Sequence, residues 1–396
     1  MHVGVVVAGF EPESGGGFTF ENEILAALAA LAAQAKHRFT LLCPPASLSH
    51  LEAFVAGSGV AVAAAPRATG RLLAAALREL EMFRIHWRRP SDLDRAAAPL
   101  GVEFIWFLGP QAARTDISYL TVVWDLQHRA TPWFPEMSAR GVWDARDAEH
   151  RWFLQRASGI VTGTQVGVEQ LGRFFQIPTE NTLVLPHPTP RFASAVAAGE
   201  GAQDMRAKFS LGERFALYPA QFWPHKNHAN LVLAAAILRR RGLDVHLALP
   251  GSDKGARDHV LKLAAREGVS DLIHPLGFVA RDDLTALYRQ ALALAYVSWC
   301  GPENLPPLEA FALGCPVIAT DIPGAREQLG DAALFCEPGS PESIAEAIAR
   351  CHADDEMRAA LIAAGKARAG RFTPSDYVNG VFGYLDRFES IRRCWA

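Results

Sequence analysis

The sequence lacks a hydrophobic run as long as the roughly 20 residues that a membrane-spanning helix needs. The apolar run Met1–Gly9 is shorter, and it also lacks the basic segment and the cleavage site of a secretory leader. The alanine-rich stretch Ile24–Ala35 is interrupted by Gln34. We therefore expect a buried first strand and a packed helix at these two places, and neither a leader nor a membrane anchor.

Cysteine is scarce and scattered. Six cysteines occur among 396 residues, none of them in a Cys-x-x-Cys pair, and no cysteine–histidine spacing resembles a zinc site. They stand at positions 43, 300, 315, 336, 351 and 394. We expect reduced thiols in a cytoplasmic protein, without a bound metal.

Charge of either sign is also unremarkable, since 39 basic and 42 acidic residues leave a net charge of −3. The densest basic run, Arg239–Arg241, fits the last turn of a helix, where cations face the negative end of the helix dipole. No basic block suits a phosphate backbone, so we expect no nucleic-acid partner. No Gly-x-Gly-x-x-Gly follows a predicted strand, which argues against an NAD-dependent oxidoreductase.

The sequence does contain a long alternation of short apolar strands and longer helical stretches. With 396 residues, half of them hydrophobic, two domains with separate cores are the default expectation. Strands that are apolar throughout favour parallel sheets covered by helices on both faces. The predicted fold class is therefore α/β, with two doubly wound parallel-sheet domains in tandem.

The individual elements follow from this alternation. Strands in the first half are predicted at Val3–Ala8, Arg38–Cys43, Val102–Phe107, Tyr119–Trp124 and Gly159–Thr162, with helices at Glu21–Gln34, Arg71–Arg84 and Ala148–Arg156. Strands in the second half are predicted at Ala216–Tyr218, His246–Pro250, Ile273–Leu276, Leu292–Val297, Pro316–Thr320 and Ala333–Cys336. Helices there are predicted at Lys226–Arg241, Ala256–Glu267, Arg281–Gln290, Pro307–Leu313, Ala325–Leu329 and Pro341–His352.

A change of composition separates the two halves. Leu185–Pro190 is a rigid, proline-rich segment, and Ala195–Gln203 is small and featureless. We place the linker there, between a first domain at 1–195 and a second at 205–374. Ligands of doubly wound sheets bind beyond the carboxyl ends of the strands, so the cleft between the domains is the expected site.

Two loops of the first half lie at such strand ends. Gly15–Gly17 opens a helix, where glycines let a ligand approach the free backbone N–H groups, although a simple flexible turn explains them equally well. Asp125 and His128 directly follow a strand, and His128 is a candidate acid, base or hydroxyl ligand. From spacing alone, a structural hydrogen bond of His128 to a loop carbonyl is the better explanation.

Three segments of the second half carry the stronger signals. Lys226 stands between a predicted strand and the start of a helix. Its ammonium group and the positive end of the helix dipole then lie together, which favours binding of an anion. Gly301–Glu309 runs from a strand through a Gly/Pro loop into a helix, where the N–H groups of Asn304 and Leu305 are expected to be free. The third signal is quieter: a strand end at Gly277 exposes backbone groups beside the ring of Phe278, which suits a nucleobase read through main-chain hydrogen bonds.

In order and spacing, Tyr218–His228, Leu276–Val279 and Gly301–Thr320 resemble the C-terminal domain of the retaining GT-B glycosyltransferases of family four, the glycogen-synthase-like and mannosyltransferase-like group. The N-terminal half matches less specifically, through Gly15–Gly17, Trp124–His128 and the proline-rich segment. The resemblance implies two Rossmann-like domains facing across a cleft. It also implies that a last helix, at about 375–396, crosses back to the first domain.

The resemblance further implies a nucleotide-diphosphate sugar as co-substrate, with no metal and no other cofactor. Lys226 matches the lysine that contacts the donor phosphates, and Glu309 matches the glutamate that holds the ribose. Asn304 and Leu305 match the loop whose amides meet the phosphates. The remaining donor-binding candidates are Gly16, Gly17, Gln221, Phe278 and Val279.

The sequence departs from the family pattern at three places. The glutamate that usually contacts the donor sugar falls on Gly301, and Glu303 is the candidate to replace it. The arginine that usually accompanies the lysine falls on Gln221. The family's histidine falls on Trp124, which leaves His128 as the nearby candidate. The catalytic candidates are therefore Lys226, His128 and Glu303.

By resemblance, the acceptor is a hydroxyl of a glycan or of a lipid-linked sugar, and polysaccharide biosynthesis is the expected context. A peripheral association with a membrane surface stays open, although no basic amphipathic helix stands out. The missing Glu and Arg motivate one alternative, a non-catalytic sugar-nucleotide-binding protein on the same fold. A sugar-nucleotide epimerase or a phosphorylase of similar architecture is the other.

Overall fold

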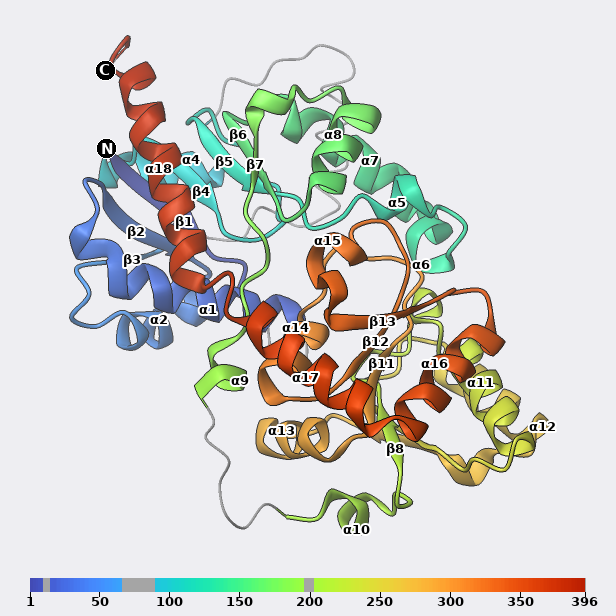
Figure 1. Ribbon diagram of the computed structural model, residues 1–396. Helices are drawn as coiled ribbons and strands as arrows, with labels where there is room; N and C mark the ends of the chain where they lie inside the picture. The colour runs from blue at the N-terminus through green and yellow to red at the C-terminus, as the bar shows by residue number, and fades with distance from the viewer. Residues whose placement is uncertain (10–14, 66–89, 196–202, 396) are drawn as a thin grey trace.

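The chain folds around two separate sheets in a computed structural model that describes residues 1–9, 15–65, 90–195 and 203–395 (Figure 1). Within these residues the first sheet has seven strands in the order β3-β2-β1-β4-β5-β6-β7, and the second has six in the order β10-β9-β8-β11-β12-β13. All neighbouring strands run parallel. The predicted fold class, two doubly wound parallel-sheet units, is confirmed.

The strands of the first sheet are β1 (His2–Val6), β2 (Arg38–Cys43), β3 (Ala61–Ala64), β4 (Phe104–Phe107), β5 (Tyr119–Val122), β6 (Gly159–Thr162) and β7 (Thr182–Val184). Those of the second sheet are β8 (Phe215–Leu217), β9 (His246–Pro250), β10 (Ile273–Gly277), β11 (Ala293–Tyr296), β12 (Val317–Thr320) and β13 (Ala333–Cys336). Sequence analysis missed β3 and β7. Both lie at sheet edges and are partly exposed, so they lack the continuous apolar run that marks a central strand.

Helices connect the strands throughout. In the first unit they are α1 (Gly16–Leu31), α2 (Leu48–Phe54), α4 (Asp92–Ala97), α5 (Gln127–Ala130), α6 (Pro135–Ser138), α7 (Val142–Leu154), α8 (Gln165–Phe175) and α9 (Arg191–Ala195). In the second they are α10 (Met205–Phe209), α11 (His228–Arg240), α12 (Arg257–Arg266), α13 (Arg281–Gln290), α14 (Leu305–Leu313), α15 (Ala325–Leu329), α16 (Pro341–Ala353) and α17 (Asp355–Ala369). The predicted helix Arg71–Arg84 and most of the predicted linker lie outside the described residues.

The last helix, α18 (Pro374–Arg392), lies along the first sheet although it ends the chain, as Figure 1 shows in red. It packs against α1, and its Phe382 ring stacks on Phe39 of β2 with centroids 5.2 Å apart. Phe388 similarly contacts Phe104 of β4 at 4.8 Å. The first core thus incorporates residues from both ends of the sequence.

The strand order reverses at one point in each sheet, between β1 and β4 and between β8 and β11. In doubly wound sheets the loops on the two sides of such a reversal leave to opposite faces, and ligands bind there, outside the carboxyl ends of the strands. The loop after β1 leads to Gly16, the loop after β8 carries Lys226, and the loop after β11 carries Gly301 and Asn304. The fold therefore places three of the segments singled out in the sequence, those with Gly16, Lys226 and Gly301, at its two switch points.

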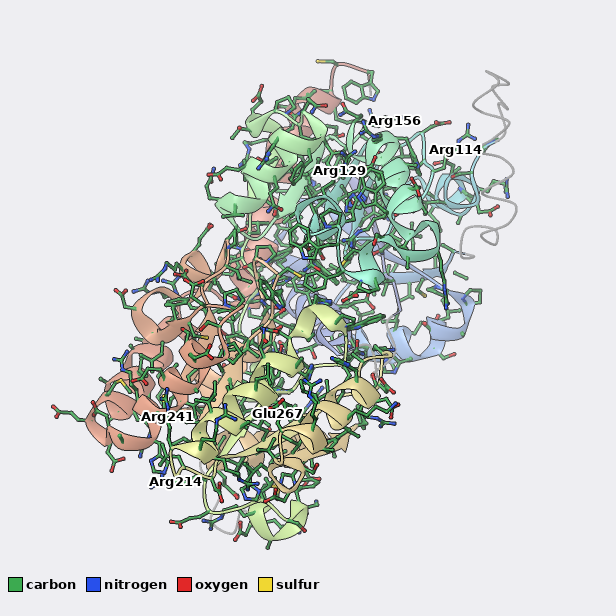
Figure 2. The ribbon with its side chains drawn as sticks, turned by 90° about the vertical axis from the view of Figure 1, so that its right-hand side faces the viewer. Arg114, Arg129, Arg156, Arg214, Arg241 and Glu267 are labelled. Carbon is green, nitrogen blue, oxygen red and sulfur yellow. The ribbon has the colours of Figure 1, made fainter. Side chains whose placement is uncertain are left out.

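The basic run Arg239–Arg241 ends α11, as predicted. Arg239 forms ion pairs with Asp244 and Asp271, and Arg241 pairs with Glu346. Figure 2 shows Arg241 and Arg214 on the lower unit, apart from Arg129 and Arg156 on the upper one. Separately, no helix in the described part of the chain is long and apolar enough to cross a membrane.

Candidate functional site

Lys226 ends a 3₁₀ turn, Pro224–Lys226, immediately before α11. The next residue, Asn227, adopts a left-handed conformation with φ of 63°, and its side-chain amide donates to the carbonyls of Val297 and Pro338. These two bonds anchor the turn to the strand end of β11 and to the loop after β13. The backbone at Lys226 is therefore fixed by buried hydrogen bonds.

Lys226 is partly buried, and its ammonium donates to the hydroxyl of Tyr296 at 3.0 Å. It also lies 5.3 Å from the centre of the Tyr296 ring. Burial lowers the pKa of Lys226, but the Tyr296 hydroxyl and other neighbours outweigh this effect, so the pKa is raised above its ordinary value. The group is a permanent cation at neutral pH, with N–H donors left over for a ligand.

The loop after β11 reaches α14 through Gly301 and Asn304. Gly301 has a φ of 108°, and a Cβ atom there would lie 3.0 Å from Asn304 Oδ1. This conformation excludes the glutamate that the resembled family carries at this position, unless the loop changes. Glycine at 301 is therefore matched to the loop seen here.

The prediction of free amides in this loop is corrected for Asn304. Its backbone N–H donates to Gln328 Oε1 at 3.0 Å, and Gln328 Nε2 donates back to the Asn304 carbonyl at 2.9 Å. Nothing in the sequence indicated this pair of hydrogen bonds from the Gln328 side chain of α15. Leu305 is the first residue of α14, where an N–H group has no partner within the helix.

Loops from the two sheets meet at this point. A Cβ atom on Gly16, the first residue of α1, would lie 3.7 Å from Leu305 Cδ1. The preceding Gly15 has a φ of 70° and Gly16 is exposed, so the start of α1 faces the start of α14 with its backbone accessible. Gly17 follows in the first turn of α1. Two helix N-termini and Lys226 are thus brought close together, as an anion site requires.

Glu309 is buried in the second turn of α14, with 7% of its surface exposed. It accepts a hydrogen bond from the buried Tyr288 hydroxyl at 2.7 Å, through Oε2. Burial raises the pKa of the Glu309 carboxyl to about 7. A carboxyl with this pKa accepts two hydroxyl hydrogen bonds only when it is ionised.

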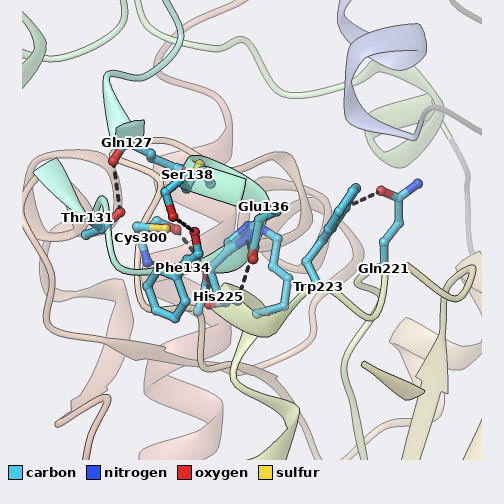
Figure 3. A network of polar contacts seen from close by, with 12 residues as sticks. Gln127, Thr131, Phe134, Glu136, Ser138, Gln221, Trp223, His225 and Cys300 are labelled. Carbon is cyan, nitrogen blue, oxygen red and sulfur yellow. Dashed lines mark hydrogen bonds and ion pairs between the residues drawn. The ribbon is translucent and has the colours of Figure 1, made fainter. Parts of the chain in front are cut away.

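The other predicted donor contacts occupy nearby loops. Phe278 follows β10 and is 70% exposed, while Val279 beside it is partly buried. Gln221 follows β8, and its Oε1 accepts from the indole of Trp223 at 2.9 Å, as Figure 3 shows. Gln221 supplies no charge, so Lys226 lacks the arginine that the resemblance implies.

Glu303 reaches from the second unit to the segment that joins the two sheets. Its Oε1 accepts from the backbone N–H of His187 at 2.9 Å, and its Oε2 lies 3.1 Å from His187 Nδ1. A Cβ atom on Gly163 would lie only 1.2 Å from Glu303 Oε2, so glycine makes room for the carboxylate. The His187 ring in turn packs edge-on against Phe20 of α1 at 5.0 Å.

A second contact crosses between the units beside Lys226. Glu136 of α6 accepts from the backbone N–H of His225 at 3.0 Å, and its Oε1 lies 2.6 Å from His225 Nδ1 (Figure 3). Burial, followed by the charge of Lys226, lowers the pKa of His225 to about 4. Sequence analysis did not single out Glu136, which lies in no recognisable motif, or His187, whose segment Leu185–Pro190 was noted only for its prolines.

The structure argues against the predicted role of His128. Its ring is fully buried, and neither ring nitrogen has a hydrogen-bond partner among the described residues. Asp147 Oδ1 lies 3.6 Å from Nε2, and burial lowers the pKa of His128 to about 4. A neutral ring packed against Phe175 and His150 cannot reach a sugar in this arrangement.

Asp125 is the accessible polar residue of this segment. It pairs with Arg146 of α7 at 2.6 Å, and although burial opposes ionisation, Arg146 lowers the pKa of Asp125. A pocket of about 280 Å³ opens beside this pair, lined by Pro110, Val123, Trp124, Asp125, Arg146, Glu149 and His150. The carboxyl end of β5 therefore offers polar groups, but from Asp125 and not from His128.

Among the described residues, one group has the geometry for a metal ion: His37, Asp386 and Glu389. His37 stands at the amino end of β2, at the opposite edge of the sheet from the loops described above. His37 Nε2 already lies 3.1 Å from Asp386 Oδ1. This group is therefore unrelated to the Lys226 site.

Comparison with known proteins agrees with this architecture. Residues 202–368 match the family model described as "Glycosyl transferases group 1". O-antigen chain mannosyltransferase B of Escherichia coli is 31% identical over 168 residues, which are 42% of this chain and 44% of that protein. D-inositol 3-phosphate glycosyltransferase of Salinispora arenicola is 29% identical over 234 residues, 56% and 52% of the two chains. The chain spans about half the length of these curated relatives.

Solved structures share the fold over nearly the whole chain. Sucrose-phosphate synthase from Thermosynechococcus elongatus superposes with a TM-score of 0.73 at 19% identity, covering 98% of this chain and 100% of that one. Anabaena HepE, solved in complex with UDP and glucose, gives a TM-score of 0.68 at 16% identity, with the same coverage. The two sheets of this protein thus have the GT-B arrangement, and residues 202–368 are similar to the group 1 glycosyl transferases.

Proposed function

We propose that this protein is a retaining glycosyltransferase that transfers a hexosyl group from a nucleotide-diphosphate sugar to a hydroxyl of a glycan or lipid-linked acceptor in polysaccharide biosynthesis. One observation carries the proposal: the Lys226 ammonium and the starts of α1 and α14 lie close together where loops of the two sheets meet. The relatives named as mannosyltransferases support hexosyl transfer, and the neighbour solved with UDP and glucose supports the donor class.

In the proposed reaction, the bond between the sugar and the diphosphate breaks while negative charge develops on the departing phosphate. The Lys226 ammonium, the Leu305 amide and the dipoles of α1 and α14 stabilise that charge. Such preorganised donors are typically worth about 3–4 kcal/mol each. The acceptor hydroxyl attacks from the face that the leaving group vacates and gives its proton to the departing phosphate oxygen, so the configuration is retained.

The remaining donor contacts are proposed from the resemblance. Glu309, when ionised, accepts from the ribose hydroxyls, and Phe278 with Val279 borders the base. Glu303, whose carboxylate contacts His187 in the structure, is the candidate to contact the sugar in place of the glutamate that is absent at 301. The mechanism assigns no role to His128, a metal or another cofactor.

A panel of donors tests the proposal. The protein is mixed with UDP-, GDP- and ADP-linked hexoses, and thermal unfolding and release of the nucleoside diphosphate are measured. We expect one base to raise the unfolding temperature by mass action and its sugar donor to be turned over. Stabilisation without any release or transfer, using glycan and lipid-linked acceptors, would contradict the enzyme assignment.

The alternative, a non-catalytic sugar-nucleotide-binding protein, rests on Gly301 and Gln221. At these two positions the chain lacks groups that the resembled family places at the sugar and phosphates. The donor panel separates the two functions because binding alone would leave the donor intact. Turnover that disappears in a Lys226 variant would exclude this alternative.

A further inference from the structure

Tyr296, the last residue of β11, connects Lys226 to the loop after β11. Its hydroxyl accepts from Lys226 Nζ at 3.0 Å and donates to Asn304 Oδ1 at 2.6 Å. Asn304 Nδ2 then donates to the carbonyl of Gly301 at 2.9 Å. A chain of three hydrogen bonds thus runs from the ammonium to the glycine that replaces the family's glutamate.

Each link in this chain has a defined polarity. An ammonium can only donate hydrogen bonds, so the Tyr296 oxygen must accept from Lys226, and the Tyr296 O–H group donates to another acceptor. That acceptor is Asn304 Oδ1. The Asn304 side-chain nitrogen is then oriented to donate to the Gly301 carbonyl. Hydrogen bonds linked in this way polarise one another and fix the rotamers of the side chains between them.

The Tyr296 ring is itself immobilised. The residue is 5% exposed, and its ring meets that of Tyr218 edge-on at 5.4 Å and 89°. The Tyr218 hydroxyl donates to the backbone carbonyl of Lys226 at 2.7 Å. The Lys226 ammonium therefore lies against an immobilised aromatic ring. This contact restricts a side chain that would otherwise be flexible because of its length.

We propose that Tyr296 is a positioning residue: it holds the Lys226 ammonium and, through Asn304, the loop at Gly301 in one arrangement that receives the donor diphosphate. The inference rests on the proposed function for its ligand. It gives Asn304 a role different from the one predicted, since the side chain and not the backbone amide carries the interaction. It also accounts for a site that lacks both the arginine at 221 and the glutamate at 301, because the remaining cation is held in a fixed position.

The first test probes the contact without any ligand. Full-length wild type and Tyr296→Phe are labelled with acetic anhydride over a range of pH, and modification of Lys226 is quantified by mass spectrometry. Without the hydroxyl, burial dominates and the pKa of Lys226 falls, so its labelling near pH 8 should rise at least threefold. The exposed Lys262 is the internal reference.

A matched variant controls for loss of stability. Tyr119→Phe also removes a buried tyrosine hydroxyl, which donates to the Phe153 carbonyl in the first unit. It should leave Lys226 labelling unchanged. Unchanged labelling in Tyr296→Phe, or an equal change in Tyr119→Phe, overturns the positioning role.

The second test measures the ligand. Affinities for UDP, GDP and ADP are compared with those for UMP, GMP and AMP by calorimetry. Tyr296→Phe should lower the affinity for the diphosphate that binds wild type about tenfold. It should change the affinity for the corresponding monophosphate less than threefold. Asn304→Ala should act in the same direction, and the double variant should be no weaker than Tyr296→Phe alone, because both residues belong to one chain.

The outcomes distinguish the two proposals. A wild-type protein that binds none of the diphosphates overturns the proposed function, and the donor role of Tyr296 falls with it. Wild-type binding with equal losses for monophosphate and diphosphate in Tyr296→Phe overturns only the positioning role.

Discussion

Removal of the charge at Lys226 is the most direct test of the donor site. Lys226→Met keeps an unbranched side chain of similar length, so the apolar stem still packs beside Tyr296 while the ammonium is lost. One N–H of the ammonium is used by the Tyr296 hydroxyl, which leaves two for phosphate oxygens. The change therefore removes the charged donor and leaves the two helix N-termini in place.

The magnitude follows from these remaining groups. Loss of one preorganised donor costs about 3–4 kcal/mol of transition-state stabilisation, so kcat should fall about 10²–10³-fold. The Tyr296 oxygen also loses a partner, at a stability cost of about 1 kcal/mol. In a unit of this size that lowers Tm by about 2–4 °C, too little to explain the loss of rate.

The assay is the initial rate of nucleoside diphosphate release with the donor identified by the panel, measured well below the Tm of both proteins. Lys262→Ala, an exposed change on α12 whose side chain is 79% accessible, serves as the charge-matched control and should retain wild-type rates. A Lys226→Met enzyme within threefold of wild type would refute the assignment of Lys226 to the departing phosphate.

Three further predictions concern Glu309, His128 and Glu303. Because burial raises the pKa of Glu309 to about 7, the affinity for the nucleoside diphosphate should rise with pH between about 6 and 8. Glu309→Gln should abolish that rise in calorimetric titrations. A variant whose affinity depends on pH as wild type does would exclude Glu309 as the ribose acceptor. The pKa of His128 is lowered from 6.5 to about 4, so the neutral ring contributes fully to the free energy of unfolding above pH 6.5. About 3 kcal/mol of that free energy is lost as the pH falls towards 4. In urea unfolding, the free energy of unfolding of His128→Gln should depend less on pH than that of wild type, and turnover at pH 7.5 should be nearly normal. Glu303→Ala should reduce turnover at least tenfold more than His187→Ala in the same release assay, because only Glu303→Ala removes the proposed sugar contact. Equal reductions in the two variants would show that Glu303 acts only through its contact with His187.

The sequence supports the prediction of the central strands because buried parallel strands are apolar throughout. Every strand predicted from such a run is present, with ends displaced by a few residues, and only the short edge strands β3 and β7 were missed. The helix that contains Glu309 was also predictable, because Pro306 and Pro307 mark its start and Gly314, with a φ of 75°, closes it. Local chemistry is sufficient for these features.

The site was predictable only as a set of segments. A motif places Lys226, Asn304 and Glu309 on particular turns, and the topology then brings those turns to one edge. The partners of these residues come from elsewhere in the chain: Gln328 occupies the Asn304 amide, and Tyr288 contacts Glu309. No local pattern specifies such partners, since they are fixed by how helices pack across a sheet.

The sequence by itself therefore determined the two parallel sheets, the loops at their carboxyl edges and the cation at Lys226. The tertiary structure alone decided that His128 is buried while Asp125 is accessible, and that Glu303 meets His187. The physical reason is the range of the interactions: strand and helix formation depends on neighbours within a few residues, whereas pairing at the site depends on groups 21 to 116 residues apart in the sequence.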